Sequence, residues 1–341
     1  MRFSSKVVTP AIAVGGSIIV TTLILWAMGE PPGAFGRAFA AGSFGSFSNF
    51  SEMLVKATPL LVAALGVSVA FKAGLFNIGV EGQIYAGGLA AAYVAAAWHL
   101  PAGLHALVAM GAGALIGGML TLVPAWLKVS RGVNEVITTL MVYYVASLAV
   151  HYMVVNPLRA PGVVPATRPI ADTAVLPVLV RGTRLHMGVV IAVVLGVLLW
   201  FLIYRTVFGF HVRSIGENRI AAAYAGIPVS QVVYLSMFLS GAVAGMAGAI
   251  QVLGVDHRFF DQFSPGLGFD SIAVALVGMA HPLGTIFAGF LFGALRTGVL
   301  EMTVRFGTPK ALALVVEGLT VLFLAFERLY RVKLLREGRV R

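Results

Sequence analysis

Three acidic side chains lie inside apolar stretches of this 341-residue chain, where an ionised carboxylate costs free energy. They are Glu81 in FNIGVEGQIYAGG, Asp270 in LGFDSIAVALVG and Glu317 in LALVVEGLTVLF. An acidic group inside hydrocarbon normally faces a polar partner or a water-filled cavity, so all three positions are candidates for a functional role. Glu317 lies in the middle of its stretch, where bending toward the membrane surface cannot restore its hydration.

The segment around Glu81 is unusually polar and flexible. Residues 72–88, KAGLFNIGVEGQIYAGG, also carry Asn77 and Gln83 and contain five glycines. A helix that begins within a membrane leaves its first four N–H groups unpaired. We therefore expect Asn77 to cap such a helix and Glu81 to lie in its first turn, where the helix dipole favours an anion. Two interpretations stay open: these side chains line a path, or they only stabilise the start of the helix.

A further polar pair, Asn134 and Glu135, opens the apolar run in RGVNEVITTLMVYY. Asn134 is a candidate for the same path, but a helix cap with a local salt bridge to Arg131 also explains the pair. Cysteine is absent, the seven histidines are scattered, and the sequence contains no GxxxxGK[ST], HExxH or GxSxG motif. The sequence therefore predicts no catalytic residue, no metal site and no cofactor, and a chain that is not an enzyme.

The composition of the chain indicates that these residues lie in a membrane. Hydrophobic residues make up 59% of the chain and charged residues 11%, and the mean hydropathy is +0.94. Soluble domains contain about 25% charged residues, so this chain is predicted to be an all-α integral membrane protein. The net charge is +11, but six of the 24 basic residues lie in the last fourteen positions, as in a cytoplasmic tail. The charge therefore indicates topology rather than nucleic-acid binding.

Ten apolar segments are long enough, or nearly so, to span a bilayer. They are 7–28, 53–71, 79–98, 104–127, 133–155, 187–204, 232–252, 268–281, 284–300 and 310–327. An even number places both termini on one side, and the basic C-terminus makes that side the cytoplasm. The proline-rich connection 156–186 should then lie outside and the connection 205–231 inside, within a single transmembrane domain covering residues 1–341.

The chain contains an internal repeat. Phe76–Gly79 (FNIG) and Phe263–Gly266 (FSPG) are each followed by a short polar stretch and a helix of small residues. Further along, GVNEV from Gly132 corresponds to GTPKA from Gly307. The halves, about 53–155 and 232–327, would have opposite topology, and inverted repeats with interrupted helices are typical of transporters.

The connection 205–231 predicts a short helix that needs a partner. In RTVFGFHVRSIGENRIAAAYAGIPVS, Asn218 is a good N-cap, residues 219–225 are helical in pattern, and Gly226 is placed to end the helix. So short a helix is not stable alone in water, so something must pack against its alanines and Tyr224. The alternative is a solvated linker.

Three stretches resemble a known family: FKAGLFNIGVEGQ, RGVNEVI and SIGENRIAAAYAGI. They are similar to permease subunits of bacterial importers of the ATP-binding-cassette (ABC) type, in the branched-chain amino acid and ribose permease superfamily and its nucleoside and simple-sugar subgroup. The resemblance covers nearly the whole chain. It implies a coupling helix that docks into a separate ATPase, through Gly216, Glu217, Asn218, Ala221, Ala222, Tyr224, Gly226 and Ile227.

The resemblance also implies partners and a location. GVNEVI is similar to the longer of two permeases that pair as a heterodimer, and a binding lipoprotein or periplasmic protein would deliver the substrate. ATP would be used by the ATPase, and the chain would lie in the bacterial inner membrane. We expect a nucleoside importer, with a simple-sugar importer as the alternative. Two alternatives come from other functional classes of membrane protein: an ion-coupled secondary transporter and an intramembrane enzyme.

Overall fold

The computed structural model describes residues 33–307, with the exception of Ser264, and some isolated positions nearer the ends of the chain. Those positions are Gly16, Ile19, Val20, Thr22, Leu23, Trp26, Val315, Gly318, Leu319 and Leu322. Regular secondary structure in this described part is entirely helical, and β-pairing there is limited to two isolated bridges. The predicted all-α architecture is therefore confirmed for these residues.

Six helices of the described part are long and apolar enough to cross a membrane, which supports a multi-pass membrane protein. They match the predicted spans 53–71, 104–127, 133–155, 187–204, 232–252 and 284–300. The helices are α3 (Phe47–Lys72), α5 (Leu104–Arg131), α6 (Glu135–Val155), α7 (Gly188–Arg205), α10 (Val229–Gln251) and α12 (Pro282–Phe306).

The other four predicted spans are not confirmed as membrane-crossing helices. The span 79–98 corresponds to α4 (Val80–Ala97), and 268–281 to α11 (Leu267–Val277). With 11 residues, α11 is about 16 Å long and covers only about half of a bilayer's hydrocarbon core. The spans 7–28 and 310–327 lie outside the described residues apart from the isolated positions. The count of ten therefore stays a prediction.

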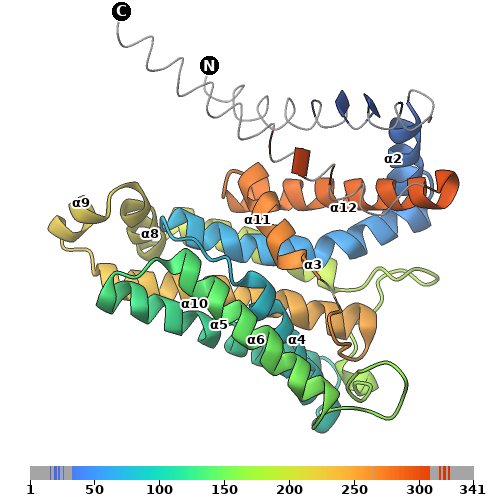
Figure 1. The fold of residues 1–341 in the computed structure, drawn as a ribbon, viewed down its shortest axis with the longest axis horizontal. Coiled ribbons are helices and arrows are strands. Elements are labelled where there is room, and N and C mark those ends of the chain that lie inside the picture. Colours follow the sequence, from blue (N-terminus) through green and yellow to red (C-terminus); the bar gives the residue numbers. More distant parts are fainter. Residues whose placement is uncertain are drawn as a thin grey trace, which may run out of the picture. The chain divides into compact units, whose positions relative to one another are not determined.

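The chain divides into two compact units, Thr58–Gly289 (the main unit) and Met1–Ala57 with Phe290–Arg341 (the terminal unit). In the main unit, α10 packs along α4 and α5, and α4 also packs against α6 (Figure 1). In the terminal unit, the Ser43 hydroxyl of α2 (Ala34–Phe44) donates to Ala294 O at 2.9 Å, which joins α2 to the later part of α12. The description as a single domain stays a prediction.

Small residues let the helices of the main unit approach closely. A Cβ atom added to Gly113 of α5 would lie 2.8 Å from Gly87 O on α4 and 3.2 Å from Gly245 O on α10. Only glycine permits this backbone contact, which is typical of helix packing in membranes. The helices α4, α5 and α10 thus form one closely packed group.

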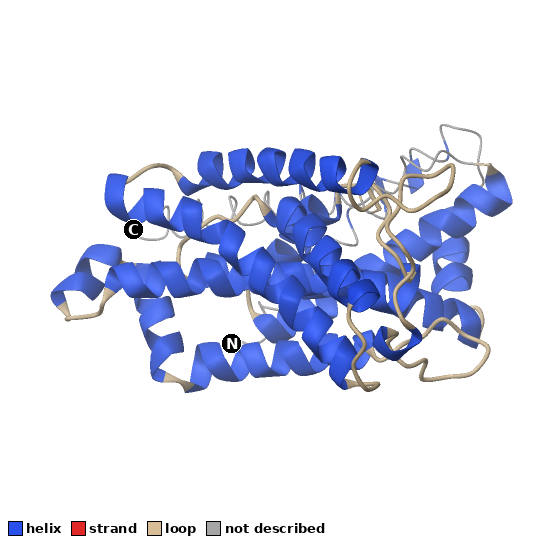
Figure 2. Ribbon diagram, turned by 90° about the horizontal axis from the view of Figure 1, so that it is seen from below, coloured by secondary structure: helices blue, strands red, loops and turns tan. Residues whose placement is uncertain are grey.

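The two long connections lie at opposite ends of the main unit. The helices α8 (Val207–Glu217) and α9 (Arg219–Tyr224) project from one end, at the left of Figure 1. The connection 156–187, with the short helix η1 (Asp172–Ala174), lies at the other end, and Figure 2 shows tan loops gathered there. That the two connections lie on different sides of a membrane stays a prediction.

Candidate functional site

The polar segment before α4 is buried and held from inside the protein. Gly79 is the N-cap residue of α4, and no side chain caps this helix end. The prediction that Asn77 is the cap is wrong, because its amide turns inward. Asn77 and Gln83 exchange two hydrogen bonds of 2.9 and 3.0 Å, and Asn77 Nδ2 also donates to Ser240 Oγ of α10 at 3.0 Å. Packing against α10 thus overrides the local capping preference of asparagine.

Glu81 lies in the first turn of α4, as predicted, but its carboxylate serves a different helix. The side chain is 1% exposed. One carboxylate oxygen accepts a hydrogen bond from Gly266 N–H at 2.8 Å, and the other accepts one from Gly268 N–H. Both donors belong to the beginning of α11, whose N-cap residue is Gly266. The two polar segments of the proposed repeat therefore meet through Glu81.

Asp270 also lies in the first turn of α11, and it is half-buried. The structure thus places Glu81 and Asp270 around the same helix start, although they are far apart in the sequence. Glu317, the third candidate carboxylate, lies outside the described residues.

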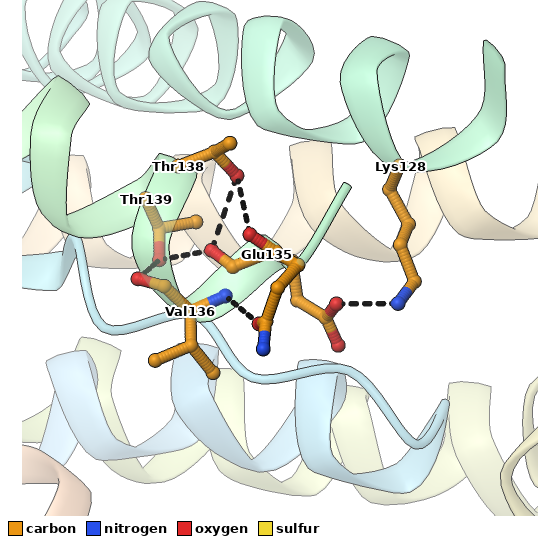
Figure 3. Close-up of polar contacts among 6 residues, drawn as sticks. Lys128, Glu135, Val136, Thr138 and Thr139 are labelled. Carbon is orange, nitrogen blue, oxygen red and sulfur yellow. Dashed lines mark hydrogen bonds and ion pairs between the residues drawn. The ribbon is translucent and has the colours of Figure 1, made fainter. Parts of the chain in front are cut away.

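Asn134 and Glu135 begin α6 in a conventional way. The Asn134 side chain accepts from Val136 N–H at 2.9 Å, which confirms it as the N-cap. The Glu135 carboxylate lies 2.6 Å from Lys128 Nζ, as Figure 3 shows. The expected partner was Arg131, but Lys128 lies in the last turn of α5 and reaches the carboxylate across the turn between the helices. Asn134 is exposed and its amide oxygen serves as the cap, so the structure gives it a local role.

The beginning of α6 also holds the segment before α4. Thr139 Oγ1 donates to Glu135 O at 2.7 Å (Figure 3) and accepts from Ile78 N–H at 3.2 Å. This hydrogen bond satisfies a backbone donor of the non-helical segment, which a membrane-embedded chain needs. The polar segment is thus fastened to α6, α10 and α11.

The short helix in the connection 205–231 is formed as predicted, one residue shorter. Asn218 Oδ1 accepts from Ile220 N–H and Ala221 N–H at 3.0 Å each, so Asn218 is the N-cap of α9. At the other end Gly226 has φ +80°. Hydrogen bonds from Gly226 N–H to Ala223 O and from Ile227 N–H to Ala222 O complete a Schellman motif. Gly226 therefore ends the helix because a left-handed residue is needed there.

The exposed face of α9 contains Tyr224, Ala221 and Ala223 as expected, but not Ala222. Ala222 is 4% exposed and faces inward, where it helps to line a hollow. Ile220 and Tyr224 are 71% and 90% exposed and are spaced one turn apart. Beside them is a hollow of about 410 Å³. Its lining residues are Phe210, His211, Ser214, Glu217, Asn218, Ala221, Ala222, Ala225, Gly226 and Ile227.

Gly216 at the end of α8 contacts the end of α3. A Cβ atom added at Gly216 would collide with Lys72 O and lie 3.3 Å from Gly74 N. The segment KAG that leads to Asn77 and Glu81 is thus in backbone contact with the helix pair α8 and α9. Gly216 was predicted to couple to a partner, and its contact within the chain is with this segment.

Some residues of the site were missed by sequence reasoning. Ser240, which accepts from Asn77, lies one turn from Ser236 on α10, and two serines at this spacing in an apolar helix are a signal that could have identified it. Both are fully buried, and among the described residues the Ser236 hydroxyl has no hydrogen-bond partner. Thr139 and Gly268 had no such signal, because their importance depends on contacts with distant segments. No cluster of three metal-ligating side chains occurs among the residues that the structure describes.

Residues 49–325 match the family model described as branched-chain amino acid transport system, permease component. The guanosine ABC transporter permease protein NupP of Bacillus subtilis is 36% identical over 327 residues, which cover 94% of this chain and 93% of that protein. The glucose ABC transporter permease protein TsgB13 of Haloferax volcanii is 36% identical, covering 95% and 88%. The nucleoside ABC transporter permease protein NupB of Lactococcus lactis is 31% identical, covering 96% and 93%. No solved structure matches the chain.

Proposed function

Since this chain belongs to the family of permease components of the branched-chain amino acid transport system, we propose that it is the membrane-spanning subunit of an ABC importer for nucleosides. The observation that carries this proposal is its 36% identity to a guanosine permease over 94% of the chain. A second relative named for nucleosides is similar over nearly the same length. Such coverage implies that the same helices build the same kind of translocation path.

The path is proposed to run past the two helix starts that meet at Glu81. Asn77, Glu81, Gln83 and Asp270 surround this meeting point, and non-helical backbone at membrane depth is tolerated where it is buried or lines a cavity. Asn77, Glu81 and Gln83 are buried, so the proposed path would have to open at this point for a substrate to pass. Glu317 is proposed as a further path residue on the tenth span.

The full architecture is proposed to be ten spans with an inverted repeat. Two local features support the repeat. Gly79 and Gly266 both occupy the N-cap position of a helix that follows a Phe-x-x-Gly motif. Gly132 and Gly307, which correspond in the repeat, follow the long helices α5 and α12 with φ +67° and +66°. Both termini and the connection 205–231 would then lie in the cytoplasm of a bacterial cell, and the chain in its inner membrane.

The partners follow from the same proposal. A separate ATPase would bind the exposed face of α9 around Ile220 and Tyr224 and would use the ATP. A second, related permease would complete the path, and a binding lipoprotein or periplasmic protein would deliver the substrate from outside. Gly216 would link the ATPase contact to the segment before α4 through its contact with Lys72.

A simple-sugar importer is the second candidate, because the glucose permease relative is equally identical in sequence. Uptake of radiolabelled guanosine and of glucose in cells with and without this gene separates the two. We expect guanosine uptake to fall at least tenfold on deletion and to return with the gene, while glucose uptake is unchanged. Loss of glucose uptake with normal guanosine uptake would replace the nucleoside proposal with the sugar proposal.

A further inference from the structure

The side chain of Glu81 connects two helix starts. It lies in the first turn of α4, and its oxygens accept from Gly266 N–H and Gly268 N–H at the beginning of α11. The unpaired N–H groups and the dipole at each helix N-terminus favour a negative charge. One buried carboxyl group at the start of α4 therefore holds the start of a second helix, more than 180 residues away in the sequence.

Backbone contact reinforces this junction. A Cβ atom added to Gly268 would lie 2.6 Å from Glu81 Cα, so the two helix starts touch without an intervening side chain. Two ring pairs lie beside it, Tyr85 with Phe263 at 5.5 Å and Tyr143 with Phe269 at 5.6 Å between centroids. These ring pairs and the backbone contact are the interactions that hold the start of α11 against the start of α4.

Each oxygen of Glu81 already has an amide donor, and the side chain is 1% exposed, so little of it remains for a substrate. We infer that Glu81 is a positioning residue, which holds the start of α11 against the start of α4 and so controls the opening of the path instead of binding the substrate. The inference rests on the proposed transport function. Under this inference, a change at Glu81 alters the maximal rate of transport and leaves the affinity for the substrate unchanged.

Glutamine is the sharpest substitution for this role. In Glu81→Gln one oxygen is replaced by an NH₂ group, which would meet an N–H donor of α11 where an acceptor is required. The carboxylate at Glu301, which pairs with Arg305 on the same helix, provides the matched control Glu301→Gln. Gly268→Ala is a second test variant, because it separates the helix starts while leaving the carboxylate in place.

The experiment has two arms on the assembled transporter. In the first, hydrogen exchange of peptides covering residues 263–270 is followed by mass spectrometry in detergent. We expect exchange at least tenfold faster in Glu81→Gln and in Gly268→Ala than in the wild type and Glu301→Gln. In the second arm, guanosine uptake should show a maximal rate lowered at least fivefold in both test variants, with the KM unchanged.

The possible outcomes distinguish a failure of the inference about Glu81 from a failure of the proposed transport function. A raised KM for guanosine with unchanged exchange would mean that Glu81 binds the substrate, and the inference would be overturned while the importer proposal stands. Unchanged exchange with an unchanged maximal rate would also overturn it. Absence of guanosine uptake in the wild type would refute the nucleoside proposal, and the exchange arm would still decide whether Glu81 holds α11. If Glu81→Gln does not assemble, Gly268→Ala decides both arms.

Discussion

The buried imidazole of His186 links the stability of the chain to pH. The imidazole is 1% exposed and precedes α7. Its Nδ1 accepts from Gly188 N–H at 3.1 Å, so Nε2 carries the proton, without a partner among the described residues. Burial, together with the charges of His257 and Arg184, lowers the pKa of His186 to about 4. The folded protein therefore resists protonation of this ring.

The sign of the pH dependence follows from linkage. In the unfolded chain the pKa of His186 is about 6.5. Between pH 6.5 and 4 the unfolded chain therefore binds more protons than the folded chain, and stability falls as the pH decreases through this window. The loss should be about 2 kcal/mol between pH 7.5 and 5. Thermal unfolding of the purified protein should show a larger drop for the wild type than for His186→Gln. Equal drops in the two proteins would contradict a buried neutral imidazole.

Tyr224 is expected to make the main contact between α9 and the ATPase. Its side chain is 90% exposed. Tyrosine is enriched among the interface residues whose truncation costs 2 kcal/mol or more of binding free energy. Tyr224→Ala should weaken recovery of the ATPase in a pull-down by about 30-fold. Val163→Ala, a truncation of a 96% exposed residue in the connection 156–187, is the control. Equal recovery by the two variants would remove Tyr224 from the docking surface.

Gly226 tests whether the end of α9 must be left-handed. A side chain at Gly226 meets nothing within 4 Å, so a substitution acts through the backbone φ of +80° and not through crowding. Gly226→Val should disturb the Schellman motif and reduce ATP-driven uptake at least tenfold, while Gly226→Asn should keep most of it, because asparagine tolerates this conformation. Similar uptake by both variants would mean that the helix end does not matter for coupling.

Local patterns predicted the elements better than the contacts between them. Asn218, Asn134 and Gly226 act on backbone within four residues, and the structure confirms all three roles. Asn77 has the same capping preference, but Ser240 and Gln83 compete for its amide. The partners of Glu81 lie more than 180 residues away, and no local pattern identifies them. For the same reason, the burial of Ala222 could not be predicted from the sequence of α9, because it depends on contacts with other segments.

The whole molecule can be tested for its orientation, because the chain has no cysteine and single introduced cysteines label without background. The connection 156–187, which contains Val163, and α8, which ends at Glu217, lie at opposite ends of the main unit. Both side chains are exposed. Val163→Cys should react with a membrane-impermeant maleimide in intact cells, and Glu217→Cys only after the membrane is permeabilised. Labelling of both cysteines from the same side would contradict the proposed topology and the inverted repeat.

The source of energy distinguishes an ABC importer from an ion-coupled secondary transporter. The most direct test is guanosine uptake into proteoliposomes that contain this chain with its ATPase, second permease and binding protein. We predict uptake that requires ATP, stops when the phosphate-binding lysine of the ATPase P-loop is replaced, and continues when ionophores collapse the ion gradients. Uptake that persists with the inactive ATPase and stops with ionophores would contradict the account.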